Sequence, residues 1–181
     1  MSSMNRLSDV EAPIRVLGVG NVLTSDDGIG PYTIRVLEAT YGFHDDVAVM
    51  DVGTPGLDFT PYIAFARSVI VVDSVKGKGA PGTVRIWRDE ELLKAPPVAR
   101  TNPHEPGLRE ALMATELTDS SPGEIVLIGV VPETVETGTH LSGAVKKALP
   151  LIVERVLEEL KRLGCPAEPL EEPKTPDIWW E

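Results

Sequence analysis

The apolar residues of this chain fall into five short runs that are typical of buried strands. These runs are Ile14–Gly18, Val47–Asp51, Val69–Asp73, Thr83–Trp87 and Glu124–Val131. Several of them are apolar at consecutive positions, a pattern that favours central strands covered on both faces. The pattern therefore predicts a sheet of five strands with helices packed on both sides.

Segments with helical periodicity separate these runs. The expected helices are Ile29–Tyr41, Leu57–Phe65, Leu108–Leu117 and Leu141–Leu163. In the last of them, apolar residues recur at helical spacing and Lys and Glu occupy the opposite face. Pro150 interrupts this helix and is expected to kink or divide it. Gly164 provides a natural stop.

The alternation of strands and helices predicts an α/β fold of the three-layer sandwich type. One connection differs from the rest, because only nine residues separate Asp73 from Thr83. A parallel crossover needs about a dozen residues or more. The fourth strand should therefore run antiparallel to the third, which makes the sheet mixed.

A length of 181 residues suits one domain, since domains usually span about 100–200 residues. We expect a flexible polar lead over residues 1–13, a single α/β domain over 14–164 and a Pro-rich tail over 165–181. The tail is too rich in proline for regular structure. It ends in Trp179 and Trp180, which we expect to dock on the domain, because paired exposed tryptophans promote association.

Charge and hydropathy narrow the range of partners. The chain has 17 Lys and Arg against 28 Asp and Glu, a formal net charge of −11, which argues against binding to nucleic acid. The N-terminal residues lack the apolar core of a signal peptide. No stretch approaches the run of about 18 apolar residues that a membrane span needs. These features predict a cytoplasmic protein.

The single cysteine, Cys165, excludes an intramolecular disulfide and a CxxC motif. We interpret it as a bystander thiol, because Glu168 nearby gives it no electropositive surroundings. His44 lies in a polar turn and His140 just precedes the last helix. Both are interpreted as solvated histidines.

The turn after the first strand, within VLGVGNVLTSDDGIG, begins like a dinucleotide-binding motif. However, Leu23 stands where the third glycine of GxGxxG is required. Asp26 and Asp27 would also repel a phosphate at the start of the following helix. A nucleotide-dependent enzyme of the Rossmann type is therefore disfavoured. We expect one aspartate to cap the helix and the other to face the crevice.

Two further residues are candidates for metal chemistry. Asp73 ends the third strand, at the edge where open α/β sheets bind ligands, although a turn residue would also fit there. His104 precedes a helix whose positive end favours the neutral imidazole that a metal ligand needs, although a solvated loop histidine fits equally well. Together with Asp27, these residues suit a divalent transition metal with open coordination positions. Their spacing alone does not establish that they meet.

Five segments resemble one protein family in order and spacing. They are GVGNVLTSDDGIG, DVGTPGLDF, VIVVDSVKGKGAPGT, NPHEPGL and LIGVVPETVETG, within residues 14–163. The chain resembles the hydrogenase maturation endopeptidases, which trim the C-terminus of the large subunit of [NiFe] hydrogenases. The resemblance implies a twisted, mixed five-stranded sheet between helices. It also implies peptidase activity on the large-subunit precursor.

The resemblance implies specific site residues as well. Asp27, Asp73 and His104 match the family's metal ligands, although some relatives carry Glu at the first position. The metal would be nickel already inserted in the precursor, with no tightly bound cofactor of the protease itself. The expected partner is the precursor, and we expect the protease to be a monomer.

The hydrolytic step remains open between two interpretations. Asp27 or Asp73 could be the catalytic base for water, or the nickel could polarise the scissile carbonyl. The alternative function is a non-catalytic nickel-binding accessory protein of hydrogenase assembly. The loop Val75–Gly82, with Lys76 and Lys78, is interpreted as a solvated turn or as a contact for the precursor. Trp87 is interpreted as a packing residue.

Overall fold

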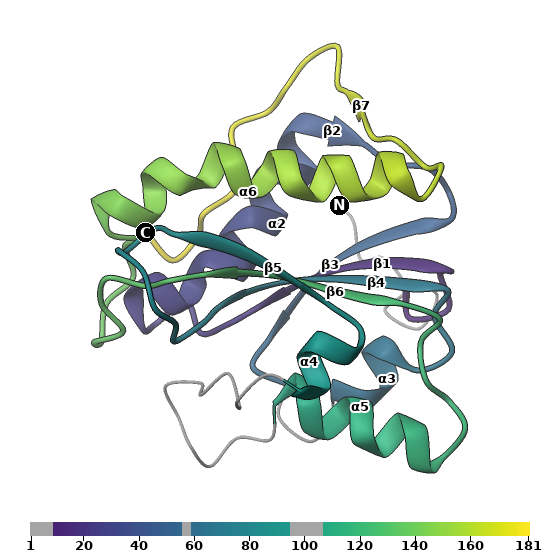
Figure 1. Ribbon diagram of the computed structural model, residues 1–181. Coiled ribbons are helices and arrows are strands. Elements are labelled where there is room, and N and C mark those ends of the chain that lie inside the picture. Colours follow the sequence, from purple (N-terminus) through teal and green to yellow (C-terminus); the bar gives the residue numbers. More distant parts are fainter. Residues whose placement is uncertain (1–8, 56–58, 95–106) are drawn as a thin grey trace.

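A computed structural model of the chain describes residues 9–55, 59–94 and 107–181. Five strands form the central sheet, in the order β3-β1-β4-β6-β5 (Figure 1). The strands are β1 (Ile14–Val19), β3 (Val47–Gly53), β4 (Ser68–Ser74), β5 (Val84–Arg88) and β6 (Ile125–Val130). Each predicted strand is present, with bounds shifted by at most two residues. The α/β fold with a mixed sheet is confirmed.

The short connection after β4 has the predicted effect on strand direction. β5 runs opposite to β4, but it pairs with β6, while β4 and β6 pair in parallel. The burial of the two strands explains this order. All six residues of β6 are buried, whereas no residue of β5 is fully buried. The more apolar strand takes the central position and β5 forms the edge.

Helices cover both faces of the sheet and complete three layers (Figure 1). Helices α2 (Ile29–Thr40) and α6 (Gly143–Arg162) lie on one face; α3 (Thr60–Ile63), α4 (Glu90–Lys94) and α5 (Leu108–Leu117) lie on the other. The helix predicted over 57–65 is shorter than expected, and its first two residues lie outside the described part of the chain. The short helix α4 is an element that periodicity did not predict. None of the helices in the described residues is long and apolar enough to cross a bilayer.

Pro150 does not divide α6, which is one continuous helix of 20 residues. The proline and Lys146, four residues before it, are both exposed. Water can therefore hydrate the Lys146 carbonyl, which lacks its usual donor because proline has no N–H. Of the two outcomes expected at Pro150, a kink or a division, the division is wrong.

Each face of the sheet has its own core. Side chains alternate along β4, so Ile70 and Val72 pack on the side of α2 and α6, whereas Val69 and Val71 pack on the side of α3 and α5. All four are at most 1% exposed. The continuous apolar run in the sequence reflects this burial on both faces.

Two glycines let α2 approach the sheet closely. A Cβ atom on Gly30 would lie 2.2 Å from the Val19 carbonyl oxygen and 2.5 Å from the Val72 carbonyl oxygen. A Cβ atom on Gly18 would lie 2.5 Å from the Gly30 carbonyl oxygen. The glycines in this segment therefore serve the packing of α2 on β1 and β4.

The tail returns across the α2 side of the molecule and contains one regular element. β7 (Glu168–Pro169) pairs antiparallel with β2 (Tyr41–Gly42), so the expectation of a wholly irregular tail is wrong over these two residues. The Lys174 N–H donates to the Ala39 carbonyl oxygen at 2.8 Å. Trp180 is 8% exposed, whereas Trp179 is 68% exposed. The predicted docking therefore holds for Trp180 alone.

Candidate functional site

The turn between β1 and α2 places two neighbouring aspartates at the carboxyl edge of the sheet. Residues Ser25–Gly28 form a 3-10 turn, η1, and α2 begins at Ile29. Gly28 is the N-cap of α2, and no side chain caps either helix by a hydrogen bond. The expected capping role for one aspartate is therefore wrong, because both carboxylates are hydrogen-bonded elsewhere.

Asp26 is fully buried and fixes the turn to a distant part of the chain. Its Oδ2 accepts hydrogen bonds from the N–H groups of Glu133 at 2.8 Å and Thr134 at 3.1 Å. Its Oδ1 accepts the N–H of Ser142, the N-cap residue of α6, at 2.6 Å. Hydrogen bonds to a buried carboxylate are among the stronger ones in proteins. Asp26 therefore stabilises the frame of the site.

The loop between β6 and α6 holds the turn through backbone contacts as well. The Ser25 N–H donates to the Gly138 carbonyl oxygen at 2.8 Å, and the Ser25 hydroxyl donates to the Glu136 carbonyl oxygen at 3.0 Å. A Cβ atom on Gly138 would lie 2.6 Å from the Ser25 hydroxyl oxygen. The segment VPETVETG thus supports the turn from the far end of the sequence.

Asp27 is only half-buried, and its carboxylate lies where the turn meets β4. Oδ2 accepts the Asn21 N–H at 2.9 Å and the Thr24 hydroxyl at 3.4 Å, and Oδ1 accepts the Ser74 hydroxyl at 2.5 Å. All three donors are neutral, and no described Lys or Arg forms an ion pair with Asp27. A carboxylate has about four lone-pair positions. Asp27 therefore has no cationic partner among the described residues and retains lone-pair capacity for a cation.

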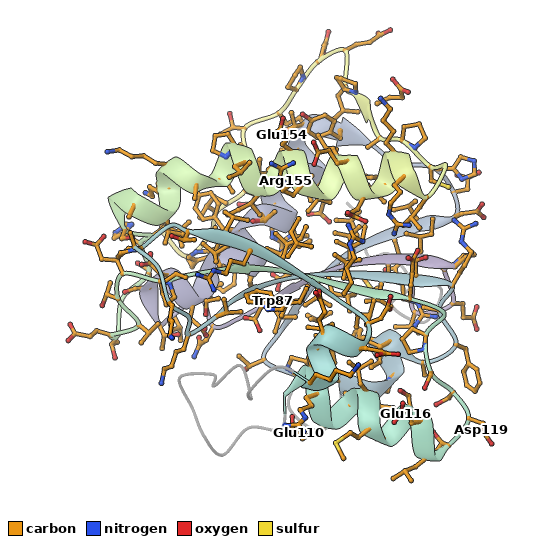
Figure 2. All side chains as sticks on the ribbon, viewed as in Figure 1. Trp87, Glu110, Glu116, Asp119, Glu154 and Arg155 are labelled. Atoms are coloured by element: carbon orange, nitrogen blue, oxygen red, sulfur yellow. The ribbon has the colours of Figure 1, made fainter. Side chains whose placement is uncertain are left out.

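Asp73 is the next-to-last residue of β4 and is 8% exposed. Alternation along the strand puts it on the face of Val71, towards α3 and α5, whereas Ser74 reaches Asp27 on the other face. Its partner on β6 is Gly129, where a Cβ atom would lie 2.5 Å from the ring of Trp87. Trp87 packs in the core on this side, as predicted (Figure 2).

The structure thus brings two of the three predicted ligand segments to one edge. β1 and β4 are parallel neighbours, so their carboxyl ends lie together, and the bond from Ser74 to Asp27 joins them. His104, the third predicted ligand, lies outside the described residues. It comes three positions before Gly107, the N-cap of α5.

Sequence reasoning missed the residues that orient Asp27. Asn21, Thr24 and Ser74 had no assigned role, although Ser74 directly follows Asp73 in the strand motif. The sequence did hold a signal for Ser74: a hydroxyl residue directly follows a strand-end aspartate. Consecutive strand residues face opposite sides, so this hydroxyl points to the other face of the sheet. The partners of Asp26 had no comparable local signal.

The rim of this edge is partly apolar and partly basic. Leu23, in the turn before Asp26, is 55% exposed. Lys76 and Lys78 are exposed in the loop that follows β4. These exposed side chains lie at the same edge of the sheet as Asp27 and Asp73, where a protein partner can contact them.

Comparison with known proteins agrees with this fold. Residues 31–159 match the family model described as hydrogenase maturation protease (HycI). The chain is 38% identical over 162 residues to the hydrogenase 2 maturation protease of Escherichia coli K12, covering 87% of this chain and 96% of that protein. It is 35% identical to the hydrogenase expression/formation protein HoxM of Azotobacter vinelandii, covering 85% of this chain and 75% of that protein.

Solved structures show the same likeness. The hydrogenase maturating endopeptidase HybD from E. coli superposes with a TM-score of 0.79 at 36% identity, over 86% of this chain and 96% of that one. The [NiFe] hydrogenase maturation protease HybD from Thermococcus kodakarensis gives a TM-score of 0.60 at 26% identity, over 81% and 97%. This chain therefore belongs to the hydrogenase maturation protease family, and its activity is that of a peptide hydrolase.

Proposed function

We propose that the protein removes the C-terminal extension of a [NiFe]-hydrogenase large-subunit precursor and recognises the inserted nickel through Asp27, Asp73 and His104. The observation that carries this proposal is the hydrogen bond from Ser74 to Asp27, which joins the turn after β1 to the end of β4. Relatives named as hydrogenase 2 maturation protease and as [NiFe] hydrogenase maturation protease support the substrate class.

The surroundings of Asp27 suit a ligand that must be held in one orientation. Its three neutral donors fix the carboxylate plane without cancelling its charge. Metal-binding carboxylates are commonly oriented by such outer hydrogen bonds. A ligand set of two carboxylates and one imidazole also leaves coordination positions open. Precursor groups that already hold the nickel occupy those positions in this proposal.

Recognition then depends on the metal and not on the peptide alone. Nickel belongs to the substrate, and the protease contributes the remaining ligands to it. A precursor without nickel offers no ion to bridge the two proteins, so it binds more weakly and is not cut. For the hydrolytic step we favour polarisation of the scissile carbonyl by the bound metal. A catalytic-base role for Asp27 or Asp73 is the alternative.

The test is intact-mass spectrometry of a cognate large-subunit precursor, nickel-loaded or nickel-free, after incubation with the protein. We expect loss of a C-terminal peptide from the loaded form alone. Cleavage of both forms would retain the protease and refute recognition of nickel. No cleavage of a confirmed cognate precursor would instead favour the non-catalytic nickel-binding accessory role.

A further inference from the structure

Three side chains with metal-binding atoms lie together at the opposite edge of the sheet. His44 and Asp46 belong to the loop between β2 and β3, and Cys165 follows the end of α6. One imidazole nitrogen, one Asp46 carboxylate oxygen and the Cys165 sulfur all lie within 4.8 Å of one another. Among the His, Cys, Asp and Glu residues within 9–55, 59–94 and 107–181, these three form the one cluster of this kind. Solvated or bystander roles for His44 and Cys165 leave this proximity unexplained.

The pairing of β2 with β7 brings these distant positions together. Tyr41 lies opposite Pro169 and Gly42 lies opposite Glu168 in an antiparallel ladder. The chain leaving β2 therefore runs beside the chain entering β7, and the three residues lie on these two segments. Gly164, with a φ of 80°, ends α6 and turns the backbone towards this ladder.

Backbone hydrogen bonds fix the residues that carry the three ligands. The Cys165 N–H donates to the Leu160 carbonyl oxygen at 3.0 Å, and the Ile14 N–H donates to the Asp46 carbonyl oxygen at 3.0 Å. The Asp46 N–H donates to Nδ1 of His44 at 3.1 Å. Metal binding at Nδ1 would replace this hydrogen bond, because both use the same lone pair of the ring nitrogen.

We propose that His44, Asp46 and Cys165 bind a divalent transition-metal ion of the zinc type. A thiolate, an imidazole and a carboxylate are the three ligand types that zinc takes in proteins, and water completes a tetrahedron. In such a site, neighbouring ligand atoms lie roughly 3.5 Å apart, given metal–ligand bonds of about 2.0–2.3 Å. Nδ1 of His44 is already 3.5 Å from Oδ2 of Asp46.

Little movement is needed to close the cluster around an ion. The side chains of His44 and Asp46 are each 56% exposed and can rotate, whereas Cys165 is 7% exposed and packs against the core. The two mobile ligands therefore close on a fixed sulfur. The ion would connect the end of α6 to the loop before β3, at the edge of the sheet opposite Asp27 and Asp73.

A cobalt titration of the full-length protein tests this proposal. Cys165 is the single cysteine of the chain, and Asp27, Asp73 and His104 carry no sulfur. A thiolate-to-cobalt charge-transfer absorption band therefore reports on this cluster alone. We expect the band to rise and saturate as Co²⁺ is added to the wild type and to bleach when Zn²⁺ is added. Processing of the nickel-loaded precursor should not depend on it.

Variants of the ligands identify the cluster. Cys165→Ser should abolish the band, and His44→Ala and Asp46→Asn should each weaken cobalt binding by about 10-fold or more. His140→Ala is the matched control, because the side chain of His140 is 69% exposed and pairs with Glu181 away from the cluster. It should bind cobalt like the wild type.

Two results would overturn the proposal. One is the absence of a thiolate band in folded wild-type protein at saturating Co²⁺. The other is a band of undiminished affinity in both His44→Ala and Asp46→Asn. Because these two substitutions replace exposed side chains, they keep the test decisive even if Cys165→Ser, in the core, fails to fold.

Discussion

The two ends of the central sheet differ in the groups that donate hydrogen bonds to their carboxylates. At the amino ends of the parallel strands, Glu159 accepts hydrogen bonds from Arg88 and Arg162. At the carboxyl ends, Asp26 and Asp27 accept hydrogen bonds from backbone N–H groups and hydroxyls, and no described Lys or Arg forms an ion pair with them. At the first end two arginines pair with Glu159, whereas at the second end the donors to Asp26 and Asp27 among the described residues are all neutral.

The amino end forms a connected ion-pair network. Arg88 Nη1 lies 3.0 Å and Arg162 Nε lies 2.8 Å from the same Glu159 oxygen, Oε2. Arg162 also reaches Glu124 at 2.9 Å, and Glu124 accepts the Ser68 hydroxyl at 2.7 Å. Burial by itself would raise the pKa of Glu159, but the hydrogen bonds from the two arginines outweigh it, so the pKa lies below its ordinary value. This network stabilises the packing of α6 on β4, β5 and β6.

At the carboxyl end, the adjacent residues Asp26 and Asp27 have different roles. Asp26 is fully buried and fixes the loop before α6. Asp27 is half-buried and faces the end of β4. Two identical side chains therefore differ because their neighbours differ. The comparison teaches that function at this edge depends on which carboxylate stays accessible, because Asp26 is fully buried whereas Asp27 is half-buried.

The largest expected effect is on cleavage when Asp27 is changed. Asp27→Asn keeps the size of the side chain but removes its charge, so cleavage of the nickel-loaded precursor should fall at least about 100-fold. Quantitative intact-mass spectrometry over time measures this rate. Asp119→Asn is the control, because Asp119 is exposed beyond the end of α5 (Figure 2) and should leave the rate unchanged. A wild-type rate in Asp27→Asn would contradict the role of Asp27.

The opposite end should respond in stability and not in cleavage. Glu159→Gln leaves Arg88 without its anion and Arg162 with Glu124 alone, so the free energy of unfolding should fall by about 2–3 kcal/mol. Urea denaturation measures this loss. The folded variant should cleave the nickel-loaded precursor at close to the wild-type rate.

Glu158→Gln provides a matched control on the same helix. Glu158 pairs with Arg155 at the surface, where both side chains are substantially exposed. Exposed pairs of this kind contribute less than about 1 kcal/mol. Equal losses in Glu158→Gln and Glu159→Gln would refute the importance of the buried network.

The pH dependence of stability should show the same network. Because the pKa of folded Glu159 lies below its ordinary value of 4.5, its contribution is fully present above that value. It is lost as the pH falls through the pKa of the folded state, since the unfolded chain then binds the extra proton. The difference in unfolding free energy between wild type and Glu159→Gln should therefore shrink below pH 4.5. A difference that stays constant on acidification would contradict this origin.

The sequence predicted the sheet well because strands that are buried on both faces have apolar residues at consecutive positions. All five strands follow from apolar runs, and α5 has the predicted bounds. β2, β7 and α4 were not predicted, because two to five residues are too few for a periodic pattern. The direction of β5 followed from a short connection, but its neighbour depended on the greater burial of β6.

The candidate site was predicted in part, for a physical reason. Asp27 and Asp73 come from a resemblance of motifs, and the fold places their segments at one edge. The division of roles between Asp26 and Asp27 was not predictable, because Asp26 binds backbone groups of Glu133 and Ser142 more than 100 positions away. His44 and Cys165 meet for the same reason, through long-range pairing that local patterns do not report.

The smallest expected effect concerns the basic rim beside the site. Replacing Lys76 and Lys78 together by alanine should slow cleavage several-fold at low salt and less at high salt, because exposed charges act mainly on encounter and are screened. Initial rates at two ionic strengths measure the effect. The double variant Lys147→Ala, Lys161→Ala, on α6, is the control. Unaltered kinetics in the rim variant would support a solvated turn.

The most direct test of the metal-binding role is a calorimetric titration of nickel, or of cadmium as a surrogate. A His44→Ala background removes one ligand of the second cluster, so that the titration reports on the site at the carboxyl edge. Asp73→Asn should weaken binding at least tenfold, or about 1.4 kcal/mol, whereas Asp119→Asn should leave it unchanged. An affinity that Asp73→Asn leaves unchanged would contradict the assignment of Asp73 as a nickel ligand.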